Sequence, residues 1–431
     1  MKNNTCKKFT KLWFSNMSLS KISGLFSLFI IVNIATAADY NLSGFGTVGL
    51  SCYTYQEADY VHNEVPDGPG RSRDCDLGLD SKLGVQIDAG ISDSLKGVFQ
   101  LTSYHRADDS YEPEITLANL NIGLSDFTRL RLGRVQNPNF LYSNYRNVHY
   151  AQPWARPPPE VYGILTTFLL DGVELNMTDQ WGLWDTEIYA GLAHGEYDVP
   201  RSNTSGTDEV EGNVAYLTLG MEKDFWQLKL GYSTGEASFE PLASKQVLDP
   251  LRSNDPAFGP LGPVFERFAR QLDIDDSSFH IYSLSAKYET PKWLVVGEYA
   301  HRTLDGFFRD LSAMYLTVGY QLEKWRPYLT YAQRWSGDPQ YTNLVPKGLN
   351  PDLDALSQGV DALMGSGNSG QYSITLGASR ELNSNSILKI QVERLTVEDS
   401  SNGMMTNSSP AFRGGDIDDE LLFSINIDFV F

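Results

Sequence analysis

The sequence predicts an all-β protein: a transmembrane antiparallel β-barrel of about 16 strands, with its third long loop folded inward. Three observations predict it. Runs of alternating apolar and polar residues recur along the chain, the connections between them are alternately short and long, and aromatic residues gather at the short connections. Barrel strands alternate in this way because one face meets lipid and the other faces the interior.

The N-terminus is predicted to be a secretory signal peptide, residues 1–37. Five lysines precede the apolar run Ile22–Ile34, and no acidic residue occurs before its end. Ala35-Thr36-Ala37 follows as a cleavage site. A membrane anchor is the less favoured alternative, because a membrane helix needs about 20 apolar residues. Cleavage near Ala37 leaves one barrel domain, residues 38–431. Removing five lysines from a formal charge of −20 leaves −25, which argues against a nucleic-acid partner.

The last strand shows the alternation most clearly. Its odd-numbered positions are all apolar: Leu421, Phe423, Ile425, Ile427, Phe429 and Phe431. Its even-numbered positions are mostly polar: Ser424, Asn426, Asp428 and Val430. We therefore expect Ile425 to face lipid and Asn426 to face water in the lumen.

Similar runs predict the other strands, about 16 in all, an even number as single-chain bacterial barrels require. They are residues 40–55, 77–89, 95–105, 114–124, 128–136, 170–178, 182–194, 213–222, 226–239, 278–288, 293–303, 311–321, 325–334, 370–381, 386–397 and 419–431. The last is expected to pair with the first, because a barrel leaves no strand edge unpaired in lipid.

The connections support a membrane barrel. Short turns near 91–94, 125–127, 180–181, 223–225, 290–292, 322–324 and 382–385 alternate with longer loops rich in Gly, Pro, Ser, Asn and Asp. Five tryptophans lie at or near short turns: Trp181, Trp184, Trp226, Trp293 and Trp325. Indole rings prefer the headgroup level of a bilayer, so these residues predict a girdle. A soluble β-sandwich with tryptophans in its core does not explain why they gather there. Within one long loop, residues 263–273 predict a short helix.

Two cysteines remain after the signal peptide, Cys52 and Cys75, on either side of the first long loop. In an exported protein they are expected to form a disulfide. No cysteine or histidine spacing suggests a metal site, and no nucleophile motif suggests an enzyme, so neither a metal, a cofactor nor a reaction is expected.

A barrel of this size leaves an aqueous channel, which something must narrow. The candidate is the connection after the fifth strand, residues 137–169, with its tyrosines, Trp154 and three consecutive prolines. The candidate pore residues are Arg129, Arg131, Arg134, Arg146, Arg156, Glu160, Tyr145 and Tyr150. Other charges expected to face the lumen are Lys96, Glu174, Glu187, Lys229, Glu298, Arg302, Lys389 and Glu393. The arginines either favour anions in the neck or pin the loop to the wall; the sequence leaves both interpretations open.

The stretch RLRLGRVQNPNFLYSNYRNVHYAQPWARPPPEVYG resembles the fifth strand and third loop of the trimeric porins of Gram-negative bacteria. The resemblance implies a constriction by the third loop and passive diffusion of small hydrophilic solutes and ions. It also implies a homotrimer in the cell outer membrane, contacts with lipid and lipopolysaccharide, and recognition of Phe431 by the barrel-assembly machinery. The acidic third-loop motif of enterobacterial porins is absent, so a cation-preferring neck is not implied. Alternatives are a channel specific for a sugar or anion, and, less favoured, an outer-membrane enzyme or adhesin.

Overall fold

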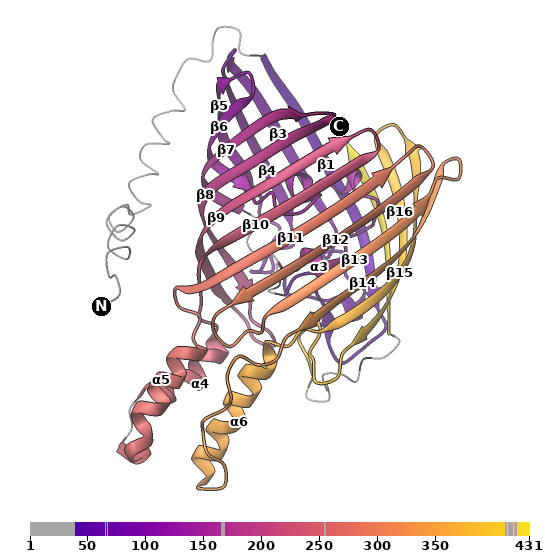
Figure 1. Cartoon of the computed structure of the whole chain (residues 1–431). Helices are drawn as coiled ribbons and strands as arrows, with labels where there is room; N and C mark the ends of the chain where they lie inside the picture. The colour runs from indigo at the N-terminus through magenta and orange to yellow at the C-terminus, as the bar shows by residue number, and fades with distance from the viewer. Residues whose placement is uncertain are drawn as a thin grey trace. The chain divides into compact units, whose positions relative to one another are not determined.

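The structure, a computed structural model, describes residues 39–64, 66, 68–164, 169–253, 256–409, 412, 417 and 420–431. The expected signal peptide lies outside these residues. Sixteen strands form one closed antiparallel barrel in which neighbours in the chain are neighbours in the sheet (Figure 1). Among the described residues, no helix is long and apolar enough to cross a membrane.

The barrel strands match the predicted runs. They are β1 (Asp39–Tyr53), β3 (Lys82–Ser92), β4 (Leu95–Tyr104), β5 (Glu114–Ser125), β6 (Thr128–Gln136), β7 (Leu169–Trp181), β8 (Trp184–Pro200), β9 (Thr207–Lys223), β10 (Trp226–Phe239), β11 (Ser277–Glu289), β12 (Trp293–Leu304), β13 (Leu311–Tyr320), β14 (Trp325–Ser336), β15 (Gln371–Asn383), β16 (Ser386–Val397) and β18 (Glu420–Val430). The predicted fold class and strand number are confirmed. The second barrel strand begins at Lys82, later than expected, because residues 78–80 form a turn; the Asp76 side chain accepts from the Gly78 amide at its start.

Strand β18 closes the barrel against β1, as predicted, with Leu50 opposite Ile425 and Gly46 opposite Phe429. The Phe429 and Phe431 rings lie over two glycines of β1. A Cβ at Gly46 would sit 2.4 Å from the Phe429 ring, and one at Gly44 would sit 2.2 Å from the Phe431 ring. A side chain at either position would therefore have to displace the ring that covers it.

The two faces of β18 are assigned correctly, but the environment of the inner face differs from the prediction. Ile425 is 45% exposed on the outer face, whereas Asn426 is fully buried. The Asn426 Nδ2 donates to the Ala155 carbonyl at 2.9 Å, because the third long loop covers this part of the wall. Asn426 therefore faces inward but does not meet water.

Aromatic side chains gather at the end of the barrel that carries the short turns. Trp181 pairs with Trp184 across one turn. The Trp226 and Tyr288 rings are 4.8 Å apart, and those of Trp293 and Tyr320 are 4.7 Å apart. Between this belt and the long loops, the outer face exposes many large apolar side chains, such as Val85, Leu230 and Leu376. This exterior is that of a membrane-spanning barrel.

Helices occur in the long loops. They are α3 (Pro159–Tyr162), α4 (Leu242–Arg252), α5 (Gly262–Leu272) and α6 (Pro351–Ser366), with the short 3-10 turns η2 (Ser72–Asp74), η3 (Ser143–Tyr145), η4 (His149–Ala151) and η5 (Pro256–Leu261). A small sheet joins β2 (Asp59–Tyr60) to β17 (Met405–Thr406). Helix α5 is where the sequence predicts it, whereas α4 and α6 were not predicted. The three long helices extend from the long-loop end (Figure 1) and pack around Leu248, Phe268 and Val360.

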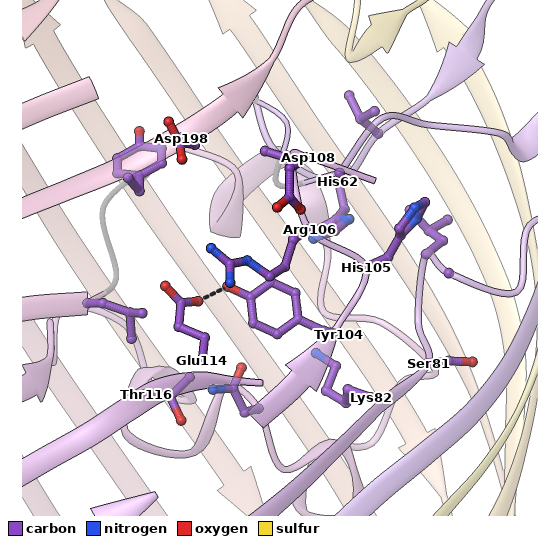
Figure 2. Close-up of a pocket in the computed structure, with 18 of the residues that line it drawn as sticks. His62, Ser81, Lys82, Tyr104, His105, Arg106, Asp108, Glu114, Thr116 and Asp198 are labelled. Carbon is purple, nitrogen blue, oxygen red and sulfur yellow. Dashed lines mark hydrogen bonds between the residues drawn. The ribbon is translucent and has the colours of Figure 1, made fainter. Parts of the chain in front are cut away.

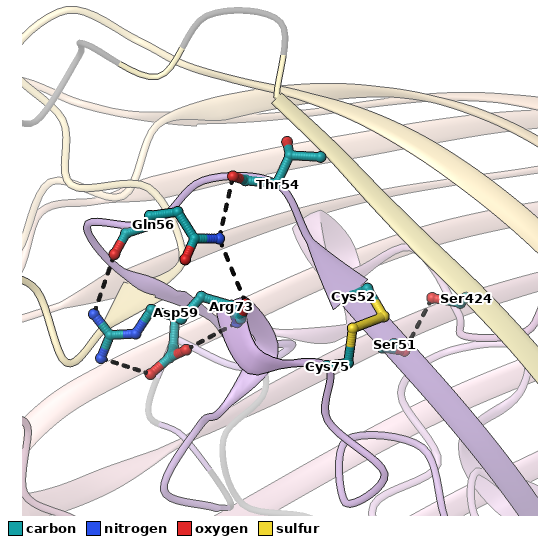
Figure 3. Close-up of a disulfide and its surroundings, with 8 residues drawn as sticks. All are labelled: Ser51, Cys52, Thr54, Gln56, Asp59, Arg73, Cys75 and Ser424. Atoms are coloured by element: carbon teal, nitrogen blue, oxygen red, sulfur yellow. Dashed lines mark hydrogen bonds and ion pairs between the residues drawn. A yellow bond between two sulfur atoms is a disulfide. The ribbon is translucent and has the colours of Figure 1, made fainter.

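In the structure, Cys52 at the end of β1 is joined to Cys75 just after η2 (Figure 3). Their Cα atoms are 4.1 Å apart. The bond closes the base of the first long loop, residues 54–81, which we name loop 1. The sequence separation of 23 corresponds to a loop-closure contribution of about 3 kcal/mol to stability.

We expect both cysteines to be oxidised in the exported protein. Thiol labelling of denatured, non-reduced protein should detect no free thiol, and labelling after reduction should detect two per exported chain. Two reactive thiols before reduction would show that the bond does not form.

Candidate functional site

The connection between β6 and β7, residues 137–168, lies inside the barrel and is named loop 3; the structure describes it as far as residue 164. Its central anchor is Trp154, which is 1% exposed. The Trp154 Nε1 donates to the hydroxyls of Thr317 on β13, at 2.9 Å, and Thr330 on β14, at 3.2 Å. A buried indole commonly finds such a partner, and two wall hydroxyls fix the height of the loop.

The start and end of loop 3 meet at one buried carboxylate, Glu298 on β12. It accepts from the Leu141 amide at 3.0 Å and from the Tyr162 hydroxyl. Tyr315 and Ser285 on the neighbouring strands also donate to it. Four donors satisfy a carboxylate that is 3% exposed, as burial of a charge requires. Glu298 thus ties both ends of the loop to the wall.

The middle of loop 3 reaches the short-turn end. The Lys389 Nζ on β16 donates to the His149 carbonyl and pairs with Asp428 on β18 at 2.7 Å. Burial, with Lys82 and Lys389 nearby, holds the pKa of His149 well below its usual value, so this imidazole is neutral. The candidate pore residue Tyr150 donates to the Ser384 carbonyl in the β15–β16 turn at 2.8 Å.

Two candidate pore residues do not line the lumen, which corrects the expectation. Arg156 is 3% exposed and makes a bidentate bond to Asp80 at 2.9 and 2.7 Å. It also donates to Ser51 and Ser424. Glu160 is fully buried, accepts from the Gln371 Nε2 at 3.0 Å, and has its pKa raised by burial. For Arg156 the structure supports the interpretation that the side chain pins the loop.

Arg134 is a further correction, because it points away from the lumen. In the register of β6 and β7, Arg134 is opposite Asp171, whereas Arg131 is opposite Glu174. Side chains alternate along a strand, so Arg134 shares the outer face of Leu132. Its guanidinium bonds to both Asp171 oxygens, at 2.8 and 2.6 Å.

The other four candidates are at least partly exposed, and the two on β6 face the lumen. Arg129 is exposed on the inner face of β6. Arg131 retains 27% of its side-chain exposure, pairs with Glu174 at 3.0 Å and lies 5.5 Å from the Tyr189 ring centroid. On loop 3 itself, Tyr145 is half-buried, and Arg146 donates to the Tyr162 carbonyl and to the Asn63 side chain.

A cavity of about 370 Å³ opens at the long-loop end on this same side (Figure 2). Its lining includes His62 of loop 1, Lys82 of β3 and Arg146 of loop 3. Glu114 lines it too and accepts a hydrogen bond from the Tyr104 hydroxyl (Figure 2). Positive and negative side chains thus share a polar outer vestibule.

Loop 3 divides the lumen. Six of the eight other charges expected there are buried: Glu174, Lys229, Glu298, Arg302, Lys389 and Glu393. Lys96 is exposed and Glu187 is half-buried, both on the uncovered wall. Two acids that hold loops in place were not among the candidates. Asp80 lies in the predicted strand 77–89, where alternation assigns a face but no partner, and Glu64 is an isolated acid in a polar loop and belongs to no pattern. Among the described residues, no group of three or more His, Cys, Asp or Glu side chains could hold a metal ion.

The closed sixteen-stranded barrel with a loop inside defines a porin-type barrel, and its apolar exterior places it in the outer membrane. The sequence matches no family model and no curated protein. Several solved structures have a fold similar to that of this chain. An anion-selective porin from Comamonas acidovorans is 13% identical with a TM-score of 0.51, covering 92% of this chain and 100% of that chain.

Two more structures show the same fold. OmpF of Salmonella typhi, in complex with daunomycin, is 12% identical with a TM-score of 0.52, covering 91% of this chain and 98% of that chain. OmpT, an outer membrane protein of Vibrio cholerae in trimer form, is 12% identical with a TM-score of 0.50, covering 92% and 100%. At such identities, the similarity shows the fold.

Proposed function

We propose that this protein is a porin that lets small hydrophilic solutes and ions diffuse passively through a water-filled channel. The observation that carries the proposal is the division of the lumen. Inward-facing side chains of β12–β18 are largely buried beneath loop 3, whereas some on the opposite wall, such as Lys96 on β4 and Arg129 on β6, are exposed. A polar passage along one wall, narrowed by an anchored loop, selects solutes by size and charge.

We propose no reaction as the function. The buried Glu298 carboxylate, for example, is engaged in holding loop 3 through four donors. We also propose a homotrimer, in keeping with the trimeric form of the Vibrio cholerae structure, and recognition of the last strand by the barrel-assembly machinery. We further propose that the outer face contacts lipid and lipopolysaccharide.

We infer a weak preference for anions, resting on fewer arginines than the sequence suggested. Arg156 is neutralised by Asp80, and Arg134 lies outside the lumen. Arg129 is exposed in the lumen, and Arg131 is partly exposed but paired with Glu174. Charges in a narrow channel are less screened than charges on external loops, so these two can outweigh the net negative charge of the chain.

Planar bilayers test both parts of the proposal. The wild type should insert in ohmic steps, with a reversal potential in a potassium chloride gradient that shows weak anion preference. Changing Arg129 and Arg131 to serine should move this potential toward cations while the barrel still shows heat-modifiable gel mobility. A wild type without conductance would refute the channel, and an unchanged potential in the double variant would refute the role of the two arginines.

A substrate-specific channel is the second candidate, because the vestibule presents side chains of both signs within one cavity. In the same bilayers, a specific channel would show current blocked by one sugar or anion at low concentration. A general porin would show conductance that rises in proportion to salt without such a block.

A further inference from the structure

Loop 1 lies over loop 3 at the long-loop end of the barrel. Its residues 59–60 pair with β17 in the last long loop, and the Val61 amide donates to the Met404 carbonyl at 3.1 Å. Beneath it, the Arg156 guanidinium lies 5.7 Å from the Tyr60 ring centroid. The Glu64 amide donates to the Gly163 carbonyl of loop 3. Loop 1 therefore rests on loop 3 rather than extending outward.

Where loop 1 lies farthest from β1, it places one carboxylate between two arginines of the barrel wall. The Glu64 carboxylate pairs with Arg302 on β12, and its Oε1 lies 3.1 Å from the Arg334 Nη2 on β14. Ser369 also donates to Oε1 at 3.3 Å. The side chains of Glu64, Arg302 and Arg334 are 5%, 6% and 0% exposed.

This cluster connects distant parts of the barrel. Loop 1 begins at β1, and β14 and β12 are the fourth and sixth strands from β1 around the barrel. The two arginines face inward, since they alternate with outward-facing neighbours such as Gln333 and His301. Buried charges need partners, so two wall guanidinium groups hold the Glu64 carboxylate, and with it loop 1, across this part of the mouth.

We propose that Glu64 is a positioning residue that makes loop 1 a second constriction, outside loop 3, and so sets the size limit for solutes at the outer mouth. The inference rests on the proposed channel function. It has a second consequence, because Glu64 also compensates the charge of Arg302 and Arg334. Releasing loop 1 would uncover both guanidinium groups at the outer mouth, widening the mouth and increasing its attraction for anions.

The test compares Glu64→Gln with Asp74→Asn. Asp74 is exposed on the same loop, so its variant removes the same charge without touching the two arginines. Glu64→Gln should pass neutral polyethylene glycols of larger mass, conduct roughly 1.5- to 2-fold more and shift its reversal potential toward anions. Asp74→Asn should behave like the wild type in all three measurements.

A triple variant guards against misfolding caused by two uncompensated arginines. Glu64→Gln with Arg302→Gln and Arg334→Gln leaves no buried charge at this cluster. It should show the larger polymer cut-off without the shift of the reversal potential toward anions. This result would distinguish the effect of a wider mouth from the effect of uncompensated arginine charge. An unchanged cut-off in a folded triple variant would overturn the proposal.

Trypsin gives a readout that does not depend on current. Cleavage after Arg71 or Arg73 in detergent should be faster in Glu64→Gln than in the wild type, because loop 1 is released. A wild type without conductance would overturn the proposed function itself. A conducting wild type, with Glu64→Gln unchanged in both cut-off and cleavage, would overturn only the role of Glu64.

Discussion

Replacing Ile425 with arginine is expected to prevent most of the protein from reaching the folded barrel. Ile425 lies in an outward row with Leu50 on β1 and Ile390 on β16, all three exposed on the outer face. An arginine on the lipid face near the bilayer midplane costs about 2–4 kcal/mol. Ile425 lies on β18, which closes the barrel by pairing with β1. The substitution therefore destabilises the pairing that completes assembly.

Gel mobility before and after heating measures the folded fraction, and Gln86→Arg is the matched control. Gln86 faces the uncovered lumen, and its side chain donates to the Asp88 carboxylate. An arginine at this position would be hydrated and could pair with Asp88. Asn426 cannot serve as this control because it is buried beneath Ala155. Equal folded fractions for Ile425→Arg and Gln86→Arg would contradict the assignment of the faces.

Replacing Asp80 with asparagine is expected to destabilise the protein by about 3–5 kcal/mol, because it removes one partner of a buried ion pair. The bidentate contact with Arg156 holds loop 3 against β1 and β18, and the nearest other carboxylate, Glu393, is 3.9 Å from the Arg156 Nη1. Loop 3 should detach from the wall at the point where the Arg156 guanidinium donates to Ser51 and Ser424. Open-channel current should therefore become larger and noisier than in the wild type.

Acid is expected to act at the same contact. Burial alone would raise the pKa of Asp80, but the Arg156 guanidinium outweighs it and lowers this pKa below the usual value. A carboxyl whose pKa is depressed by folding stabilises the protein above its unfolded pKa, about 4, and this stabilisation is lost as the pH falls through the folded pKa. The thermal stability of the wild type should thus decrease in acid, and Asp80→Asn should lack this part of the pH dependence.

Two further variants determine whether the ion pair is responsible. Asp361→Asn breaks an exposed pair with Lys347 on a long loop and should change stability by about 1 kcal/mol or less. Adding Arg156→Gln to Asp80→Asn should restore part of the lost stability, because the uncompensated charge is then gone. Simple addition of the two single effects would show that the pair does not act as a unit.

The sequence by itself determined the strands, their faces and the barrel. Alternation along β18 separates Ile425 from Asn426 because successive side chains of a strand point to opposite faces, a property of the local backbone. The same rule, applied to β6, would already have placed Arg134 with Leu132 on the outer face. Loop 3 could be located because prolines and aromatic rings mark a stiff segment between two predicted strands.

Only the tertiary structure decided which inward side chains meet water. Arg129 and Arg156 have the same charge and lie close together in the sequence, yet one is exposed in the lumen and the other is buried against Asp80. The difference arises from segments far apart in the chain, as in the pairing of Glu64 with Arg302 and Arg334. Burial depends on which loop covers which part of the wall, and a periodic pattern within one strand holds no information about that contact.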